Sequence, residues 1–192
     1  MRNLQDTLKQ NAAAWGADII GFCALPKAPI SNMPTLRYAV SIGVKLSDSV
    51  LSTIDNAPSF VYFQHYRTAN ALLDNIAFRL TRTLEAKGYA AMPVAASQSL
   101  GKNNPYQGML PHKTAAVLSG LGFVGKSGLF LSSQFGSKVR LATVLTDAPL
   151  QAELQDVVSL TYKCIIKQQN VVLQISQSCL FHGVVPAGYL FF

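Results

Sequence analysis

The chain has 192 residues, of which 49% are hydrophobic and 13% charged. This composition favours one compact domain and argues against intrinsic disorder or a large multidomain machine. Sixteen Lys and Arg residues against nine Asp and Glu give a net charge of +7, but the basic residues are scattered and form no run. The charge pattern therefore indicates solvated surface charge and favours an anionic ligand over nucleic acid.

The cysteines and the amino terminus indicate where the protein works. Cys23, Cys164 and Cys179 match no zinc or iron–sulfur spacing, and the three histidines form no paired spacing, so we expect no metal site. The amino terminus lacks a hydrophobic signal core, and no apolar stretch reaches the ~18–20 residues needed to cross a bilayer. These features predict a soluble, cytoplasmic protein that does not enter a membrane.

Apolar periodicity predicts alternating helices and strands. The clearest pattern is a run of apolar side chains at three- and four-residue steps from Tyr62 to Leu84, followed by Gly88. In chain order, the predicted elements are a helix over 3–15, strands at 19–22 and 38–44, a long helix over 59–87, a strand at 89–94, a helix over 113–118, and strands at 129–131 and 139–145. Helices interspersed with strands favour an α/β or α+β layered domain, and the pattern leaves the strand order open.

The composition changes after Leu150. Lys167 is the last Asp, Glu, Lys or Arg residue, and the chain ends Gly-Tyr-Leu-Phe-Phe. Such a segment makes a poor solvated surface, so we expect it to pack, to pair with a second copy in a homodimer, or to aggregate. We therefore divide the chain into a domain over 1–150 and an atypical tail over 151–192.

One glycine-rich segment satisfies two nucleotide-binding patterns. Residues 120–127 read Gly-Leu-Gly-Phe-Val-Gly-Lys-Ser, which matches both G-x-G-x-x-G and G-x-x-x-x-G-K-[ST]. Both patterns require a strand before the glycines and a helix after them, whereas here the preceding segment looks helical and the following one extended. A phosphate loop, a plain structural turn and a binding loop for another anionic cofactor remain the three interpretations.

The same segment belongs to a longer ordered set of motifs. Residues 112–128 read His-Lys-Thr-Ala-Ala-Val-Leu-Ser-Gly-Leu-Gly-Phe-Val-Gly-Lys-Ser-Gly, and residues 135–147 read Phe-Gly-Ser-Lys-Val-Arg-Leu-Ala-Thr-Val-Leu-Thr-Asp. Together with the upstream segments 62–66 and 84–89, this set resembles the amino-terminal domain of epoxyqueuosine reductases. The resemblance covers most of residues 1–150.

The resemblance implies an oxidoreductase domain that binds cobalamin. Its fold would be α+β with nitroreductase-like layers, a mixed sheet flanked by helices, and it would be related to the core of reductive dehalogenases. In the family a ferredoxin-like domain with two [4Fe–4S] clusters normally follows, and tRNA is the partner that the resemblance alone implies. A flavin-binding nitroreductase-like protein that holds FMN is the alternative.

The resemblance also suggests which residues would contact the cofactor. They are His112, Lys113, Gly120, Gly122, Gly125, Lys126 and Ser127, with the polar loop 97–108 as a wall of the site. No catalytic residue is assigned. The aspartate that serves as proton donor in the family falls near Tyr106, and no Asp or Glu occurs between Glu85 and Asp147.

The tail departs from the family in its cysteines. Cys164 and Cys179 cannot supply the four thiolates that a [4Fe–4S] cluster needs, so we expect no iron–sulfur cluster in this chain and an external electron donor if it is active. We interpret the tail as the product of a shifted reading frame, with a divergent native tail as the alternative. A non-catalytic remnant of the family is the second functional hypothesis.

Overall fold

A computed structural model describes residues 2–97 and 109–151, and the structural statements below concern these residues. The elements in chain order are α1 (Arg2–Ala14), β1 (Ile19–Ala24), β2 (Tyr38–Lys45), α2 (Asp48–Leu51), α3 (Phe60–Glu85), β3 (Ala91–Val94), α4 (His112–Leu118), β4 (Gly122–Val124), β5 (Phe130–Ser132) and β6 (Val139–Thr146). The predicted helices and strands are all present within a few residues of their expected bounds. The short helix α2 and the strand β4 were not predicted.

Four strands form the main sheet in the order β1-β2-β6-β3. All its neighbouring strands are antiparallel, which corrects the expectation of a mixed sheet. Strands β2 and β3 do point the same way, as a crossover through the long helix α3 requires, but β6 lies between them. The α+β class is confirmed, since helices and an antiparallel sheet make up the described chain.

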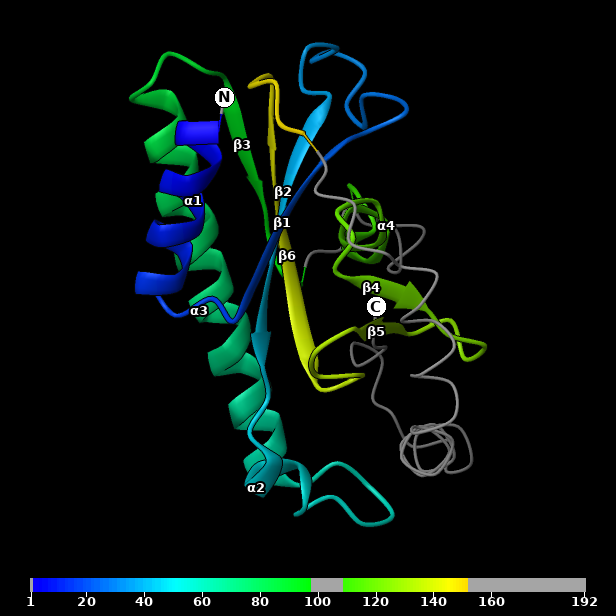
Figure 1. Cartoon of the computed structure of the whole chain (residues 1–192). Helices are drawn as coiled ribbons and strands as arrows, with labels where there is room; N and C mark the ends of the chain where they lie inside the picture. Colours follow the sequence, from blue (N-terminus) through cyan, green and yellow to red (C-terminus); the bar gives the residue numbers. More distant parts are fainter. Residues whose placement is uncertain (1, 98–108, 152–192) are drawn as a thin grey trace.

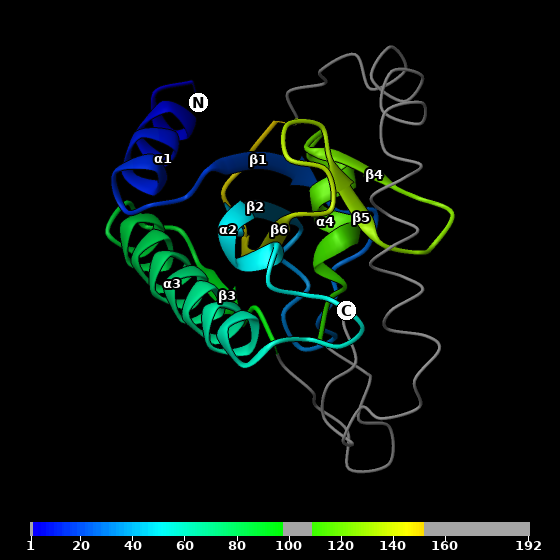
Figure 2. The same ribbon diagram turned by 90° about the horizontal axis from the view of Figure 1, so that it is seen from below.

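The main sheet is covered on both faces (Figures 1 and 2). Helices α1 and α3 lie on one face, and α4 with the β4–β5 hairpin lies on the other. Alternate residues of the central strands point to opposite cores: Val40, Ile42 and Val144 pack with the α1–α3 side, whereas Ala39 and Leu145 pack with the α4 side. Burial on both faces explains why β2 and β6 are almost continuously apolar in sequence.

Helix α3 is the main support of the first core. The hydroxyl of Ser59 accepts a hydrogen bond from the backbone N–H of Tyr62 and caps the helix, with Pro58 just before the cap. The side of the helix that faces the sheet buries an apolar stripe, which includes Leu73, Leu80 and Leu84. The stripe anchors the helix along the whole sheet and fixes the direction of its polar residues.

The remaining expectations concern membrane crossing, metal binding and the tail. None of the helices in residues 2–97 and 109–151 combines the length and apolar character needed to cross a membrane. The same residues contain no group of three His, Cys, Asp or Glu side chains arranged to hold a metal ion. Cys164, Cys179 and Tyr106 lie outside the described residues, as does almost all of the tail, so the division at 150 and the shifted reading frame stay predictions.

Candidate functional site

The glycine motif is a helix-to-hairpin connection. Helix α4 precedes it and strand β4 lies within it, so the order of elements is opposite to that of a phosphate loop. Gly120 adopts a φ of 73° just past the helix, where its N–H donates to Val117 O at 2.9 Å and the N–H of Leu121 donates to Ala116 O at 3.0 Å. This pair of bonds is a Schellman helix end, which requires the left-handed conformation that glycine adopts without strain.

Gly122 is needed where the two strands of the hairpin approach each other. It pairs with Ser132 across the hairpin, and a Cβ atom at this position would overlap the carbonyl oxygen of Leu131. Gly120 and Gly122, both predicted as cofactor contacts, therefore have structural roles that need no ligand. The interpretation as a plain structural turn accounts for these two positions.

The rest of the motif forms the turn of the hairpin. The N–H of Gly125 donates to Leu129 O at 2.9 Å, and the N–H of Gly128 donates to Gly125 O at 2.9 Å. Lys126 and Ser127 lie exposed on this turn. Lys113 Nζ donates to Gly128 O at 3.2 Å, so the first turn of α4 reaches the turn of the hairpin. The structure thus brings together four of the predicted contacts, Lys113, Gly125, Lys126 and Ser127.

His112 points away from this turn and into the protein. Its Nε2 lies 2.8 Å from Ala95 O, and its Nδ1 lies 2.9 Å from Thr143 Oγ1. Because a carbonyl oxygen only accepts, we assign the proton to Nε2, and Nδ1 then accepts from the Thr143 hydroxyl. Burial lowers the pKa of His112, which favours this neutral form at pH 7. The side chain ties α4 to the end of β3 and to β6.

The state of His112 gives a pH-dependent prediction. Its folded pKa lies below the unfolded value of about 6.5, so at lower pH the unfolded chain binds a proton that the folded chain excludes. The free energy of unfolding should therefore fall as the pH drops from 7.5 to 5.5. The variant His112→Gln should lose part of this slope in urea unfolding at the two pH values, because glutamine does not titrate. An unchanged slope in the variant would show that His112 is accessible to protons in the folded state.

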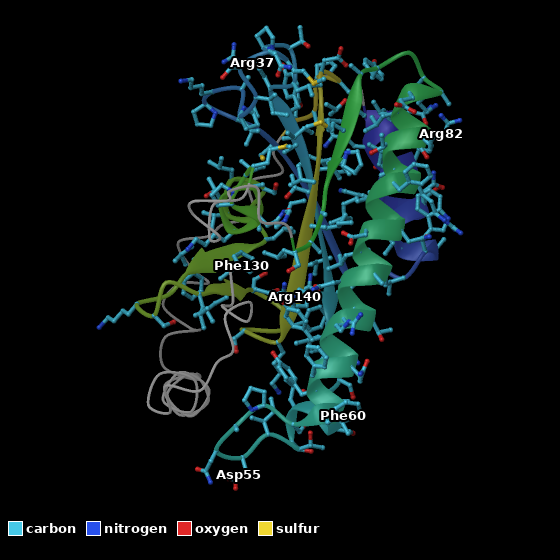
Figure 3. The ribbon with its side chains drawn as sticks, turned by 180° about the vertical axis from the view of Figure 1, so that it is seen from behind. Arg37, Asp55, Phe60, Arg82, Phe130 and Arg140 are labelled. Carbon is cyan, nitrogen blue, oxygen red and sulfur yellow. The ribbon has the colours of Figure 1, made fainter. Side chains whose placement is uncertain are left out.

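A second polar cluster lies at the edge of β6 that β3 leaves uncovered. Strand β3 pairs only with Thr143–Thr146, so residues 139–142 have no described strand on that side. Arg140 lies in this stretch and is only 9% exposed. Its Nε donates to Asn70 Oδ1 at 3.0 Å and its Nη2 to the Tyr66 hydroxyl at 2.8 Å, with the guanidinium 4.2 Å from the centre of the Tyr66 ring. Figure 3 shows Arg140 between helix α3 and the hairpin that carries Phe130.

His112 lies by the other face of β6: it bonds Thr143 on the α4 side, whereas Arg140 bonds Asn70 and Tyr66 of α3. The charge of Arg140 contributes to the lowered pKa of His112, after the larger effect of burial. We call Tyr66, Asn70, His112, Arg140 and Thr143 the edge cluster. It combines a buried cation, a neutral imidazole, a phenol, an amide and a hydroxyl at one edge of the sheet.

The segment that precedes the loop predicted as a wall of the site is anchored to two helices. The N–H of Ala96 donates to Asp74 Oδ1 of α3 at 2.8 Å, and Ala95 O accepts from His112 of α4 at 2.8 Å. His112, which follows the loop in the chain, is thus bonded to the residue that precedes it. Residues 98–108 themselves lie outside the described part of the chain.

Sequence reasoning did not single out Arg140. The available signals were a single charged residue within the apolar run Val139–Thr146 and the polar or aromatic residues Tyr62, Tyr66, Asn70 and Asp74 at four-residue steps on α3. In the sequence, Tyr62 counts only as the start of the apolar run that predicts the long helix. The structure shows Tyr66 as a partner of the buried guanidinium.

Two surface hollows lie elsewhere. One of about 310 Å³ is lined by Lys45, Asp48 and residues 133–138, and one of about 320 Å³ by the proline-rich loop between β1 and β2. In the first hollow Asp48 binds both Lys45 and Lys138, at 2.6 and 2.7 Å. Neither of these two hollows is lined by a residue of the glycine motif.

Comparisons with solved structures identify proteins of similar fold. An epoxyqueuosine reductase crystallised with an epoxyqueuosine-modified tRNA-Tyr stem loop matches 80% of this chain at a TM-score of 0.58 and 18% identity. The epoxyqueuosine reductase of Bacillus subtilis matches 80% of the chain at 0.57 and 18% identity. A reductive dehalogenase, whose structure is described as suggesting a mechanism for B12-dependent dehalogenation, matches 84% at 0.66 and 17% identity.

These matches confirm the resemblance seen in the sequence at the level of the fold. The chain spans 48% of the length of the first epoxyqueuosine reductase and 23% of that of the dehalogenase. No protein-family model matches the chain, and no curated protein sequence matches it. The described domain therefore has the α+β fold found in part of these larger reductases.

Proposed function

We propose that residues 1–150 form the corrinoid-binding domain of a reductase, with cobalamin as the cofactor. The observation that carries the proposal is the shared fold, since epoxyqueuosine reductases and a B12-dependent reductive dehalogenase both match about four-fifths of the chain. The ordered motifs over 112–128 and 135–147 support the same assignment. FMN is the alternative cofactor, because the sequence also fits a nitroreductase-like protein.

The residues at the hairpin turn have the chemistry to hold such a cofactor. Cobalamin carries amide groups and a phosphate, which need hydrogen-bond donors and a positive charge. The exposed turn supplies Lys126 and Ser127, and Lys113 of α4 reaches the same turn. Gly125 has no side chain that would keep a ligand away from the backbone there. When bound, the cofactor would supply a reducible metal centre, while this chain would position the ligand and limit the access of water.

His112 has a different part in this proposal from the one expected. Its two ring nitrogens hold Ala95 and Thr143, so it supports the layer that carries the turn instead of contacting the cofactor directly. We assign no proton donor among the described residues.

Electrons must reach such a domain from outside it. The three cysteines of the chain are fewer than the four thiolates that one [4Fe–4S] cluster takes. We therefore propose an external electron donor in the cytoplasm, and tRNA as a substrate only by analogy with the epoxyqueuosine reductase that was solved with a tRNA stem loop. The second candidate, a cofactor-binding remnant without turnover, is favoured by Tyr106 in place of the expected aspartate.

Titration with cobalamin tests the proposal. The full chain should shift the absorbance spectrum of cobalamin, and Lys126→Ala should weaken binding about tenfold, because it removes a charge-assisted contact worth about 1.4 kcal/mol. Lys87→Ala, which removes an exposed lysine after α3, is the matched control and should bind as the unchanged chain does. FMN is titrated in parallel.

The outcomes separate the hypotheses. A shift with FMN alone would replace cobalamin by a flavin, and no shift with either cofactor would contradict the proposed domain function. Equal weakening by both lysine variants would show that binding follows net charge and not the hairpin turn. Binding without reduction of any substrate would favour the remnant.

A further inference from the structure

Arg140 is a buried cation whose described partners are all neutral. It is only 9% exposed, and its guanidinium donates to the amide oxygen of Asn70 and the hydroxyl of Tyr66. An arginine side chain stays protonated in proteins. Burial of a charge is unfavourable unless an opposite charge or several hydrogen bonds compensate for it, and the contact with the Tyr66 ring compensates only in part.

The chain offers few carboxylates that could neutralise Arg140. Among the described residues no carboxylate forms an ion pair with it: Asp48 binds two lysines, and Asp74 accepts from the backbone of Ala96. The loop 98–108 contains no Asp or Glu at all. Beyond Asp147 only Glu153 and Asp156 remain as acidic side chains.

The geometry around Arg140 is that of a prepared anion site. Asn70 and Tyr66 hold Nε and Nη2, so they fix the plane of the guanidinium, and no described residue takes up Nη1. The group lies at the stretch of β6 that β3 leaves uncovered. His112 adds no competing positive charge when it is neutral, and its Nδ1 is occupied by the hydroxyl of Thr143.

We infer that the edge cluster binds an oxyanion, the carboxylate or phosphate group of a ligand, through Arg140. The guanidinium provides the charge and donors, and Tyr66 and Asn70 provide the orientation. This inference is independent of the cofactor: an oxyanion should bind at Arg140 whether or not cobalamin binds at the hairpin turn. It assigns an anionic substrate to a domain whose sequence already favoured an anionic ligand.

Thermal unfolding of the full chain in added oxyanions tests the inference. Inorganic phosphate and, in a second series, acetate are added at constant ionic strength with chloride as the balance. At least one series should raise the melting temperature in a saturable way, and the stronger one identifies the phosphate or the carboxylate as the preferred group. Arg140→Met should abolish the response, which corresponds to a loss of affinity of about tenfold or more.

A matched control uses the neighbouring cation Lys138, which is partly exposed. Lys138 lies just before β6 and its ion pair is with Asp48, so Lys138→Met removes the same charge at a solvated position. This variant should keep the response to the oxyanion. A response that is lost in both variants, or equal responses to the oxyanions and to chloride, would overturn the inference.

Two further measurements address two other cases. In the first, Arg140→Met does not fold; in the second, a carboxylate of the tail neutralises Arg140. In the unchanged chain the buried Nε–H of Arg140, held by Asn70, should give a slowly exchanging ¹⁵N signal that moves when phosphate or acetate is added; a signal unmoved by both overturns the inference. The double variant Glu153→Gln, Asp156→Asn should keep its stability and its oxyanion response. A large loss of stability, together with no oxyanion response in the unchanged chain, would show that the tail neutralises Arg140.

Discussion

Gly122→Ala is expected to destabilise the domain by about 3 kcal/mol or more. The change adds only a Cβ atom, but that atom would overlap the carbonyl oxygen of Leu131 on the neighbouring strand, and a backbone atom cannot move aside as a side chain can. The strands of the hairpin would have to separate. Urea unfolding measures the loss, and cofactor titration of the variant would show whether the hairpin must be formed for binding.

The control for this prediction is another glycine of the same hairpin. Gly128 has a φ of 76°, and no atom lies within 4 Å of an added Cβ. Gly128→Ala should therefore strain the backbone but cause no steric overlap. A cost of about 1–2 kcal/mol follows from the left-handed conformation alone. Equal costs at the two positions would mean that the approach of β4 to β5 does not constrain residue 122.

Phe22→Ala is expected to cost about 3–5 kcal/mol. The Phe22 side chain is fully buried in the core between the sheet and the α1–α3 layer, and the large cavity left behind can close only in part. Thermal or urea unfolding of the full chain measures the effect. Because the domain of a marginally stable protein holds about 5–15 kcal/mol in total, this one change should remove a large share of it.

Phe78→Ala gives the same substitution at an exposed site. Phe78 lies on α3 with 58% of its surface exposed, so the expected change is within about 0.5 kcal/mol. A loss at Phe78 as large as the loss at Phe22 would indicate that another surface covers α3 in solution. A small loss at Phe22 would contradict the placement of β1 in the core.

Periodicity predicted the elements whose burial follows one regular stripe or run. The long helix was recognised because its apolar stripe from Ala69 to Leu84 faces a single core, and β2 and β6 because both of their faces are buried. The order of helix before strand around the glycines was also predicted correctly. This order argues against a phosphate loop, which needs a strand before the glycines and a helix after them.

Tertiary contacts decided the features that the sequence could not show. Strand β4 has three residues and begins with a glycine, which is too short for any periodicity, and it forms only because β5 pairs with it. The direction of His112 and the burial of Arg140 depend on where β3 ends. The antiparallel order of the sheet likewise depends on β6, the last strand, entering between β2 and β3.

The anchored ends of the loop between β3 and α4 have a consequence for how the protein could diversify. Ala95 and His112 meet directly, and Ala96, Met109 and Leu110 pack against the two cores, so the residues that flank positions 98–108 are held by the scaffold. The entropy of closing a flexible loop grows slowly, by about 0.6 kcal/mol for each doubling of its length. Insertions, deletions and exchanges at positions between these anchored residues can therefore be selected for recognition of a new molecule at little thermodynamic cost, while the scaffold stays the same.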